Sequence, residues 1–398
     1  MTANRHEIVS LLDQIQDLVE KLRPELEADA ELRNKLVSTS KQLTRTFQTS
    51  MDQAWEIFFQ PHHLSVLQTA LDAGWLHTIV DAGDSGVSAD HLASTSRADA
   101  SIVKRLMRVL IATGSIREVS RNMYAPAEIS KLFTDPKMAA GLKHASHDYA
   151  VSVSKMPEYF AENGYQVADD VEKGVYAYAR GMPFLRYMGQ TPAAAQEFNL
   201  FMSATRAGKR FWADTFPIEK LKVNSEEDVL LVDMGGGNGH DLVDFSARQE
   251  SLQLKGKLVL QELPRVIAQV PDDLKNLFNL QDHDFFTPQK EVHARVYYVS
   301  NVLHGWSDED CITILTHVKD AMKAGYSTLL LNEIVLPDVG CSFWGAAFDV
   351  TMMAMVSGRN RTRQEWSHLL STIAGLKVEN IWSLEVNGGS IIEVIRME

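Results

Sequence analysis

Apolar residues recur at steps of three and four along the first fifty residues, with charged residues mostly between them. This spacing predicts amphipathic helices over residues 1–50, interrupted at Pro24. Their main apolar stripe comprises Ile8, Leu11, Leu12, Ile15, Leu18, Val19 and Leu22. Such a stripe has to be covered, either by the rest of the chain or by a second copy. We slightly favour a dimerisation contact in a homodimer.

Residues 51–135 show short amphipathic stretches followed by a hairpin signal. Ser65–Val80 and Ser101–Ile116 have the spacing of helices. Residues 116–119 and 122–126 then have the pattern of two strands joined by a turn. Helices followed by a small hairpin are typical of a winged-helix domain, which is the prediction for this segment.

Residues 136–219 lack strand signals and are rich in aromatic and methionine side chains. We expect a helical linker that also caps the substrate, because such side chains form adaptable apolar pockets. Phe198, Asn199 and Met202 share helical spacing and are the preferred candidates for lining the acceptor site. His144, three residues before His147, is a candidate polar contact to the substrate.

Strand patterns alternate with helix patterns from residue 220 to residue 398. The strands are apolar on both faces, as in a parallel sheet covered on both sides. They are expected at Leu230–Met234, Leu258–Glu262, Val296–Val302 and Ser327–Leu336, with two terminal strands near 377–396 as an edge hairpin. The predicted fold class is α/β, a Rossmann-like doubly wound sheet that forms the cofactor-binding domain.

The first of these strands runs through Asp233 into a glycine-rich turn that ends at Gly239. A strand that turns through glycines into a helix lets a ligand approach bare backbone, which marks a nucleotide-like cofactor site. The dinucleotide fingerprint fails, because His240 stands where the third glycine after Gly235 and Gly237 belongs. No Gly-Lys-Ser/Thr follows for a phosphate loop. The turn therefore suits a cofactor without phosphate.

Glu262 ends the second predicted strand, 23 residues after Gly239. An acid at about this separation is placed to accept both hydrogen bonds from a ribose diol. An adenosine cofactor without phosphate implies S-adenosyl-L-methionine. Asp233, Gly235, Gly237 and Glu262 are therefore candidate cofactor-binding residues.

Charge and cysteine content narrow the function classes. The 398 residues carry a net charge of −13, which argues against nucleic acid as a partner, and the candidate recognition helix has only Lys104, Arg105 and Arg108. The two cysteines are too few for a disulfide framework, which favours a cytoplasmic location. Charges among the first residues argue against a signal peptide or membrane span. No metal site is predicted.

His304 follows the strand Val296–Val302, at the same sheet edge as the glycine turn. Glu333 lies at the equivalent level of the next strand. A histidine is more often structural, but a carboxylate next to Nδ1–H fixes the tautomer and leaves Nε2 free as a base. Methyl transfer to a hydroxyl needs such a base, because a phenol or alcohol is a weak nucleophile until its proton leaves.

Six segments of the chain, in order, resemble the small-molecule O-methyltransferases of the plant caffeate and flavonoid type and especially their fungal secondary-metabolism relatives. They are VDMGGGNGH, QELPRVI, HDFF, LHGWSDEDC, NEIVLPD and MMAMVSGRNRTRQEW. The resemblance implies an intertwined homodimer without a metal, acting on an apolar or aromatic small molecule. It implies cofactor contacts from Gly235, Gly237, Glu262, Asp284, Phe285 and Trp306, a general base at His304 and an orienting Glu333. Met353 and Asn360, in the last segment, are further candidates for the acceptor site.

Three positions around His304 depart from that family. Gly305 replaces the aspartate of His-Asp-Trp, Asn360 replaces a glutamate, and Ser300 stands where a lysine or arginine is common. Losing a carboxylate beside an imidazole lowers its basicity. Some fungal proteins resembling this family use the bound sulfonium as a fixed positive charge for dehydration and pericyclic ring formation, which is the alternative reaction. An inactive cofactor-binding regulatory subunit is a third, less favoured alternative.

Overall fold

The structure, a computed structural model, describes all residues except 1, 24–25, 27–28, 169, 207–209 and 385–388. It divides into two compact units, Met1–Leu64 and Ser65–Glu398. The first unit contains α1 (Thr2–Lys21), α3 (Ala30–Phe47) and most of α4 (Ser50–Asp72), so the predicted helices are present. The predicted interruption at Pro24 lies outside the described residues.

The apolar stripe predicted for the first helix is exposed on α1. Ile8, Leu11, Ile15 and Leu18 have exposed fractions of 51%, 51%, 55% and 56%. Further large apolar side chains are exposed on α3 and on the first turns of α4, among them Val37, Leu43, Phe47, Trp55, Phe58 and Phe59. Exposed apolar patches are typical of surfaces that bind another protein.

Short helices and a small sheet follow at the start of the second unit. The elements are α5 (Trp75–Ala82), β1 (Val87–Ser88), α6 (Ala89–Ser96), α7 (Ala100–Ala112), β2 (Ile116–Ser120) and β3 (Met123–Pro126). The predicted hairpin is confirmed, because Ile116 of β2 pairs with Pro126 of β3. The expectation of one helix over Ser65–Val80 is wrong. α4 ends at Asp72, and Gly74 adopts a left-handed φ of +72°, which glycine reaches without steric cost.

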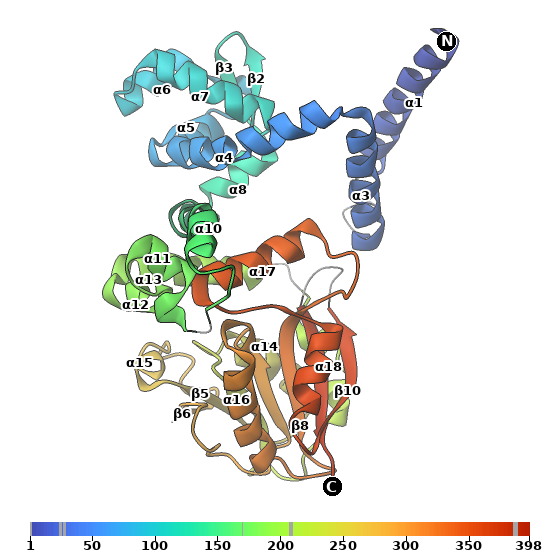
Figure 1. Cartoon of the computed structure of the whole chain (residues 1–398), viewed down its shortest axis with the longest axis vertical. Coiled ribbons are helices and arrows are strands. Elements are labelled where there is room, and N and C mark those ends of the chain that lie inside the picture. Colours follow the sequence, from blue (N-terminus) through green and yellow to red (C-terminus); the bar gives the residue numbers. More distant parts are fainter. Residues whose placement is uncertain (1, 24–25, 27–28, 169, 207–209, 385–388) are drawn as a thin grey trace. The chain divides into compact units, whose positions relative to one another are not determined.

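Helices make up the regular structure of the described residues from 128 to 206. They are α8 (Glu128–Thr134), α9 (Pro136–His144), α10 (Ala150–Glu162), α11 (Val175–Arg180), α12 (Phe184–Gln190) and α13 (Pro192–Arg206). A π-helical turn, Ala145–Tyr149, joins α9 to α10. We call α9–α13 the helical cap. It packs against α17 (Phe343–Val356), as Figure 1 shows.

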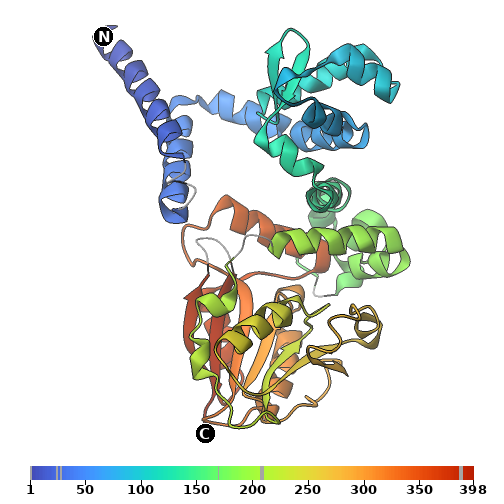
Figure 2. The ribbon, with the colours of Figure 1, turned by 180° about the vertical axis from the view of Figure 1, so that it is seen from behind.

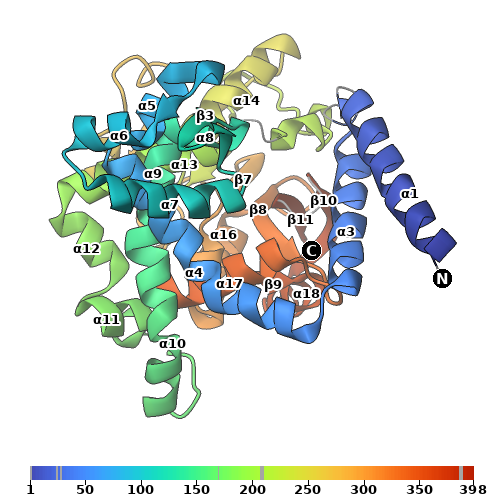
Figure 3. The same cartoon turned by 90° about the horizontal axis from the view of Figure 1, so that it is seen from above.

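The main sheet begins at residue 229. Its strands are β4 (Val229–Met234), β5 (Lys257–Glu262), β6 (Asn279–Asp282), β7 (Val296–Ser300), β8 (Thr328–Leu336), β9 (Arg361–Thr362), β10 (Leu376–Ser383) and β11 (Gly389–Arg396). The order is β10-β11-β8-β7-β4-β5-β6, with β9 paired to β8. Strands β4 to β9 pair in parallel, whereas β11 is antiparallel to both β8 and β10. Figure 3 shows β10, β11, β8 and β7 in this order. The predicted α/β sheet with a terminal hairpin is confirmed.

Strand β6 was not predicted, and neither were the two-residue strands β1 and β9. β6 is only four residues long and has the polar sequence Asn-Leu-Gln-Asp at the edge of the sheet. It therefore lacks the apolar alternation that identifies a strand.

Helices cover both faces of the main sheet. They are α14 (His240–Ser251), α15 (Pro264–Ile267), α16 (Asp308–Ala321) and α18 (Arg363–Ser371). Figures 1 and 2, seen from opposite sides, show α16 and α18 on one face and α14 on the other. Strand β4 lies between β5 and β7. The connection that follows β4 therefore leads to one side of it, and the later connection to β7 crosses to the other side. In folds of this type ligands bind at the carboxyl ends of the strands at such a point. Among the described residues, no helix is long and apolar enough to cross a membrane.

Candidate functional site

The glycine turn lies at the carboxyl end of β4. Gly235 and Gly237 have φ values of +70° and +60°, in the left-handed region that favours glycine, and Gly239 precedes α14 as its N-cap. A Cβ on Gly236 would overlap the carboxylate of the buried Asp233. Asp233 therefore packs beneath the turn and fixes its shape.

Glu262, at the end of β5, faces the same turn. Its Oε1 accepts a hydrogen bond from the N–H of Gly237 at 3.1 Å, and its Oε2 accepts one from the N–H of Leu263 at 2.8 Å. A Cβ on Gly237 would meet no atom within 4 Å, so the turn has open space beside it. A half-buried carboxylate next to bare backbone fits the ribose of an adenosine cofactor.

Aromatic rings complete this end of the sheet. Phe285 follows β6 and brings Cε1 to 3.6 Å from the position that a Cβ on Gly235 would occupy. The rings of Phe285 and Trp306 meet edge to face, with centroids 5.8 Å apart. Asp284 is exposed next to them, and its Oδ1 accepts the N–H of Phe286 at 3.0 Å. The structure thus brings together the predicted residues Gly235, Phe285 and Trp306.

His304 lies in a short 3₁₀ turn, Leu303–Gly305, just after β7. Its Nδ1 is 3.0 Å from Oε2 of Glu333, which is buried on β8. The other carboxylate oxygen, Oε1, accepts the N–H groups of Val302 at 3.0 Å and Leu303 at 2.7 Å. One carboxylate therefore holds both the loop and the imidazole. The His304 side chain is 16% exposed, and none of the described residues hydrogen-bonds to its Nε2.

The buried Arg361 also holds the loop that carries His304. The guanidinium of Arg361 donates to the carbonyl oxygens of Leu303 and Trp306, both at 3.1 Å. It also pairs with Asp308 at 2.7 Å, which compensates its charge. The carbonyl groups on either side of His304 are thus fixed.

The chain before Arg361 makes direct backbone contact with His304. The N–H of Arg359 donates to the carbonyl oxygen of His304 at 2.8 Å. A Cβ on Gly358 would overlap that oxygen and would lie 2.9 Å from Cα of Gly305. Only glycine leaves room for this approach.

Asn360, a predicted acceptor-site residue, is buried in this segment. Its backbone N–H donates to Oδ1 of Asp349 at 2.6 Å, whereas its side-chain amide has no hydrogen-bond partner within the part of the chain that the structure describes. Burial raises the pKa of Asp349. Phe348 lies on the same helix as Asp349, and the centroid of its ring is 6.4 Å from the centroid of the His304 ring.

The residues predicted to line the acceptor site do not gather in one place. His144 and Phe198 lie together in the helical cap, with ring centroids 5.2 Å apart, on a cavity of about 170 Å³. Asn199 is exposed, Met202 is half-buried, and neither lines this cavity. Among the described residues, no three His, Cys, Asp or Glu side chains gather as metal ligands would.

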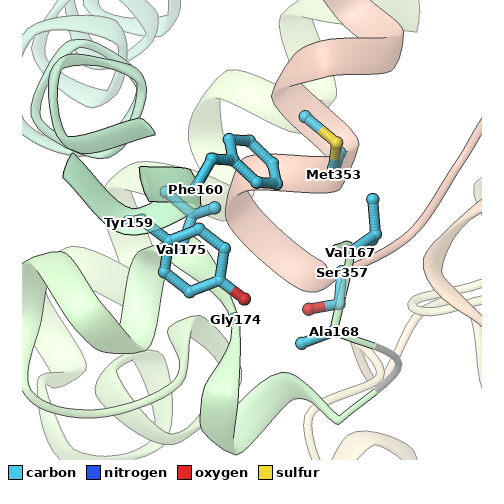
Figure 4. Close-up of a pocket in the computed structure, with 8 residues that line it drawn as sticks. All are labelled: Tyr159, Phe160, Val167, Ala168, Gly174, Val175, Met353 and Ser357. Atoms are coloured by element: carbon cyan, nitrogen blue, oxygen red, sulfur yellow. The ribbon is translucent and has the colours of Figure 1, made fainter. Parts of the chain in front are cut away.

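Met353 lies elsewhere, on α17. It lines a narrow pocket with Tyr159 and Phe160 of α10 and with Val175 of α11, and Figure 4 shows these side chains around it. The structure thus separates Met353 from His144 and Phe198.

Sequence reasoning missed several residues that the structure places at these sites. Asp148 hydrogen-bonds to His144, and its spacing of four residues was a usable signal on a helix. Tyr176, which also bonds to Asp148, is 28 residues away and gave no such signal. Arg361 stands in the GRNRT segment, but nothing in the sequence indicated that it would hold the His304 loop.

The chain matches a family model described as an O-methyltransferase domain over residues 160–377. It is 32% identical over 377 residues to "Methyltransferase cfoC" of Aspergillus candidus, covering 93% of this chain and 92% of that protein. It is 33% identical over 379 residues to "O-methyltransferase mpaG" of Penicillium roqueforti, covering 92% and 93%.

Solved structures have the same fold. LepI in complex with SAM superimposes with a TM-score of 0.86 at 22% identity, over 99% of this chain and 100% of that one. OxaC in complex with SAH and oxaline gives a TM-score of 0.83 at 22% identity, over 98% and 100%. With a family model over more than half of its length and relatives above 30% identity along almost all of it, the chain belongs to the O-methyltransferase family, which uses S-adenosylmethionine as its cofactor.

Proposed function

We propose that this chain methylates a phenolic or enolic hydroxyl of an apolar or aromatic small molecule of secondary metabolism, with His304 as general base. The observation that carries the proposal is the His304–Glu333 pair. Nδ1 is held by a buried carboxylate at 3.0 Å, and none of the described residues hydrogen-bonds to Nε2. The relatives cfoC and mpaG, named as a methyltransferase and an O-methyltransferase, support the reaction type.

The pair activates a hydroxyl by moving one proton. Glu333 accepts a hydrogen bond from Nδ1–H, which keeps the lone pair on Nε2 directed away from the carboxylate. Nε2 then takes the proton of the acceptor hydroxyl, and Glu333 stabilises the positive imidazolium that results. Contacts of Arg361 with Leu303 and Trp306 hold the loop in place during this step.

The cofactor residues fit S-adenosylmethionine, which supplies an electrophilic methyl group on a sulfonium when bound. Gly235 and Gly237 expose backbone at the sheet edge, and Glu262 presents its carboxylate to the same space. Phe285 and Trp306 offer apolar ring surface for the adenosine, with Asp284 beside them. Asp233 supports the turn from beneath.

The experiment that tests the reaction is measurement of S-adenosylhomocysteine released with candidate phenols. Stoichiometric release with a methylated product supports transfer. Product formation without any S-adenosylhomocysteine contradicts it. Phenols with increasing numbers of aromatic rings should be screened first, because the helical cap contains a cluster of aromatic side chains.

A second reaction, dehydration with pericyclic ring formation, is favoured by one observation. Asn360 puts a buried neutral amide, without a hydrogen-bond partner among the described residues, where a glutamate would flank the base. Such an amide suits hydrogen bonding to a neutral substrate oxygen better than proton removal. In this reaction bound S-adenosylmethionine is not consumed, so the same by-product measurement separates the two functions.

Replacing Glu262 with glutamine is expected to weaken cofactor binding about 10- to 100-fold, because a hydrogen bond to a charged group contributes roughly 1.5–3 kcal/mol. Calorimetric titration with S-adenosylhomocysteine measures the affinity. Glu250→Gln, an exposed position on α14, is the matched control. Equal affinity of Glu262→Gln and wild type would remove Glu262 from the cofactor site.

We also propose that the first unit makes a homodimer contact. The apolar side chains of α1, such as Leu11 and Ile15, are half exposed, and a second copy of the same helices offers complementary apolar surface. Ile15→Glu, and deletion of residues 1–45, are expected to convert a dimer into a monomer, as measured by light scattering at fixed concentration. Gln14→Glu, at the preceding position on the helix, is the control. A dimer that persists in both altered proteins would show that α1 packs elsewhere.

The proposed location is the cytoplasm. Both cysteines, the buried Cys311 and the exposed Cys341, are free thiols, as is usual for proteins of a reducing compartment. The proposed domain organisation keeps the boundaries predicted from the sequence, including the winged-helix segment at 51–135.

A further inference from the structure

Residues 358–361, which run into β9, hydrogen-bond both to α17 and to the loop that carries His304. The N–H of Arg359 donates to the carbonyl oxygen of His304 at 2.8 Å. The N–H of the next residue, Asn360, donates to Oδ1 of Asp349 on α17 at 2.6 Å. Consecutive N–H groups point to opposite sides here, as they do along a strand. The 358–361 segment is therefore held by α17 on one side, and it holds His304 on the other.

Side chains of the same segment bind the two ends of the loop. The guanidinium of Arg361 donates to the carbonyl oxygens of Leu303 and Trp306, both at 3.1 Å. Asp308, directly after the loop, pairs with Arg361 at 2.7 Å and with Arg359 at 3.4 Å. A displacement of the 358–361 segment would therefore move the whole loop and not one residue of it.

Asp349 is a carboxyl whose burial has a cost. Burial raises the pKa of Asp349, and the hydrogen bond from Asn360 and the nearby guanidinium groups of Arg359 and Arg361 only partly oppose this shift. A carboxyl is expected in such a place where its hydrogen bond is needed. Among the described residues, the N–H of Asn360 is the group that hydrogen-bonds to Asp349. Removing the carboxyl therefore releases the segment on the side of α17.

Helix α17 reaches His304 at two neighbouring positions. The ring of Phe348 stands at 85° to the His304 ring, with the centroids 6.4 Å apart. Asp349, the next residue, acts on the backbone of the loop through the 358–361 segment. The first contact is apolar and close to the imidazole, whereas the second consists of two directed hydrogen bonds in series. The second is the one that defines a position.

We propose that Asp349 is a positioning residue for the base: through Asn360 it fixes the 358–361 segment, and that segment fixes the backbone of His304. The inference rests on the proposed function, because it takes His304 to be the base. Glu333 orients the imidazole at Nδ1, whereas Asp349 sets the height of the backbone that carries the imidazole. Two carboxyls from different elements thus define the place of Nε2.

Asp349→Leu and Asp349→Asn form a matched pair, because their side chains have similar shapes and only asparagine keeps an oxygen that accepts the N–H of Asn360. Asp349→Leu is expected to lower kcat about 10- to 100-fold, since a displacement of about 1 Å can cost 100-fold. The KM for S-adenosylmethionine should not change. Asp349→Asn should restore most of the rate. Val350→Ala, at the next and exposed position of α17, is the control.

Rates are expressed per S-adenosylhomocysteine site counted by calorimetry, so that unfolded protein does not contribute. A second readout needs no turnover. The Nδ1–H proton of His304 should give a low-field NMR signal in the chain loaded with S-adenosylhomocysteine, identified by its loss in His304→Ala. This signal should move in Asp349→Leu and stay in place in Asp349→Asn and Val350→Ala. A residue needed for stability alone would lower Tm and leave the signal unmoved.

Asp349→Ser is the second variant in case Asp349→Leu does not fold. Its hydroxyl is too short to reach the N–H of Asn360, so the same loss of rate and the same movement of the His304 signal are expected. Wild-type kcat in the folded variant, or an unmoved His304 signal, would overturn the inference. So would an amide proton of Asn360 without a low-field shift in the wild type. If the proposed function fails, no S-adenosylhomocysteine is released with any acceptor, while the His304 signal still moves with Asp349.

Discussion

His304→Ala is expected to lower the rate of methyl transfer by about 10²–10⁴-fold, the usual contribution of a general base, while S-adenosylhomocysteine binds as in the wild type. The proton of the acceptor hydroxyl then has no receiving atom, because Nε2 is gone and Glu333 is buried behind the loop. Single-turnover rates with an acceptor identified by S-adenosylhomocysteine release, together with calorimetry, measure the two quantities separately.

The matched control is His368→Ala, at an exposed position on α18. It removes a histidine from the same domain and should leave the rate unchanged. If His304→Ala turns over as fast as this control, proton removal takes place elsewhere and the assignment of the base is wrong. If cofactor binding is lost as well, the loop has a structural role that the proposal does not include.

Gly358→Ala is expected to lower kcat by roughly 100-fold without any change at a reacting group. The added methyl group overlaps the carbonyl oxygen of His304, so the loop has to move, and displacement by about 1 Å can reduce a rate by this factor. We also expect a loss of roughly 1–3 kcal/mol in the free energy of unfolding, because overpacking strains the backbone. Thermal unfolding and single-turnover rates give the two values.

Gly305→Ala is the control for this substitution. Gly305 lies directly after the base, but a Cβ there would meet no atom within 4 Å. Its stability should therefore equal that of the wild type. A Gly358→Ala variant with wild-type kcat and stability would show that the contact between Gly358 and His304 is not needed for the geometry of the loop.

The sequence was most informative where chemistry and secondary structure coincide. The strand, the glycine turn and Glu262 all lie within one local segment, so their order along the chain already predicted a cofactor site at the sheet edge. His304 and Glu333 were predictable for a similar reason. In the parallel register Ser300, the last residue of β7, pairs with Asn332 of β8, which brings the residues that follow β7 close to Glu333.

The acceptor side was less predictable, because it depends on how helices pack. Phe198 and Asn199 are adjacent in the chain, yet the first lines a cavity and the second is exposed. Helical spacing gives the face of a helix but not which face turns inward. Met353 is a candidate because it lies in the last family-like segment, whereas its position on α17 against α10 and α11 follows from contacts between segments about 180 residues apart along the chain.

The C-terminal hairpin has a genetic consequence. Strand β11 lies between β8 and β10 in the sheet, and Ser390 of β11 pairs with Glu333 of β8. A premature stop codon just before Gly389 would leave every recognisable motif of the site in the open reading frame. The encoded protein would nevertheless lack the strand that supports Glu333 on one side, and so the orientation of His304. An allele of this kind would look intact in a motif search and be without activity in the cell.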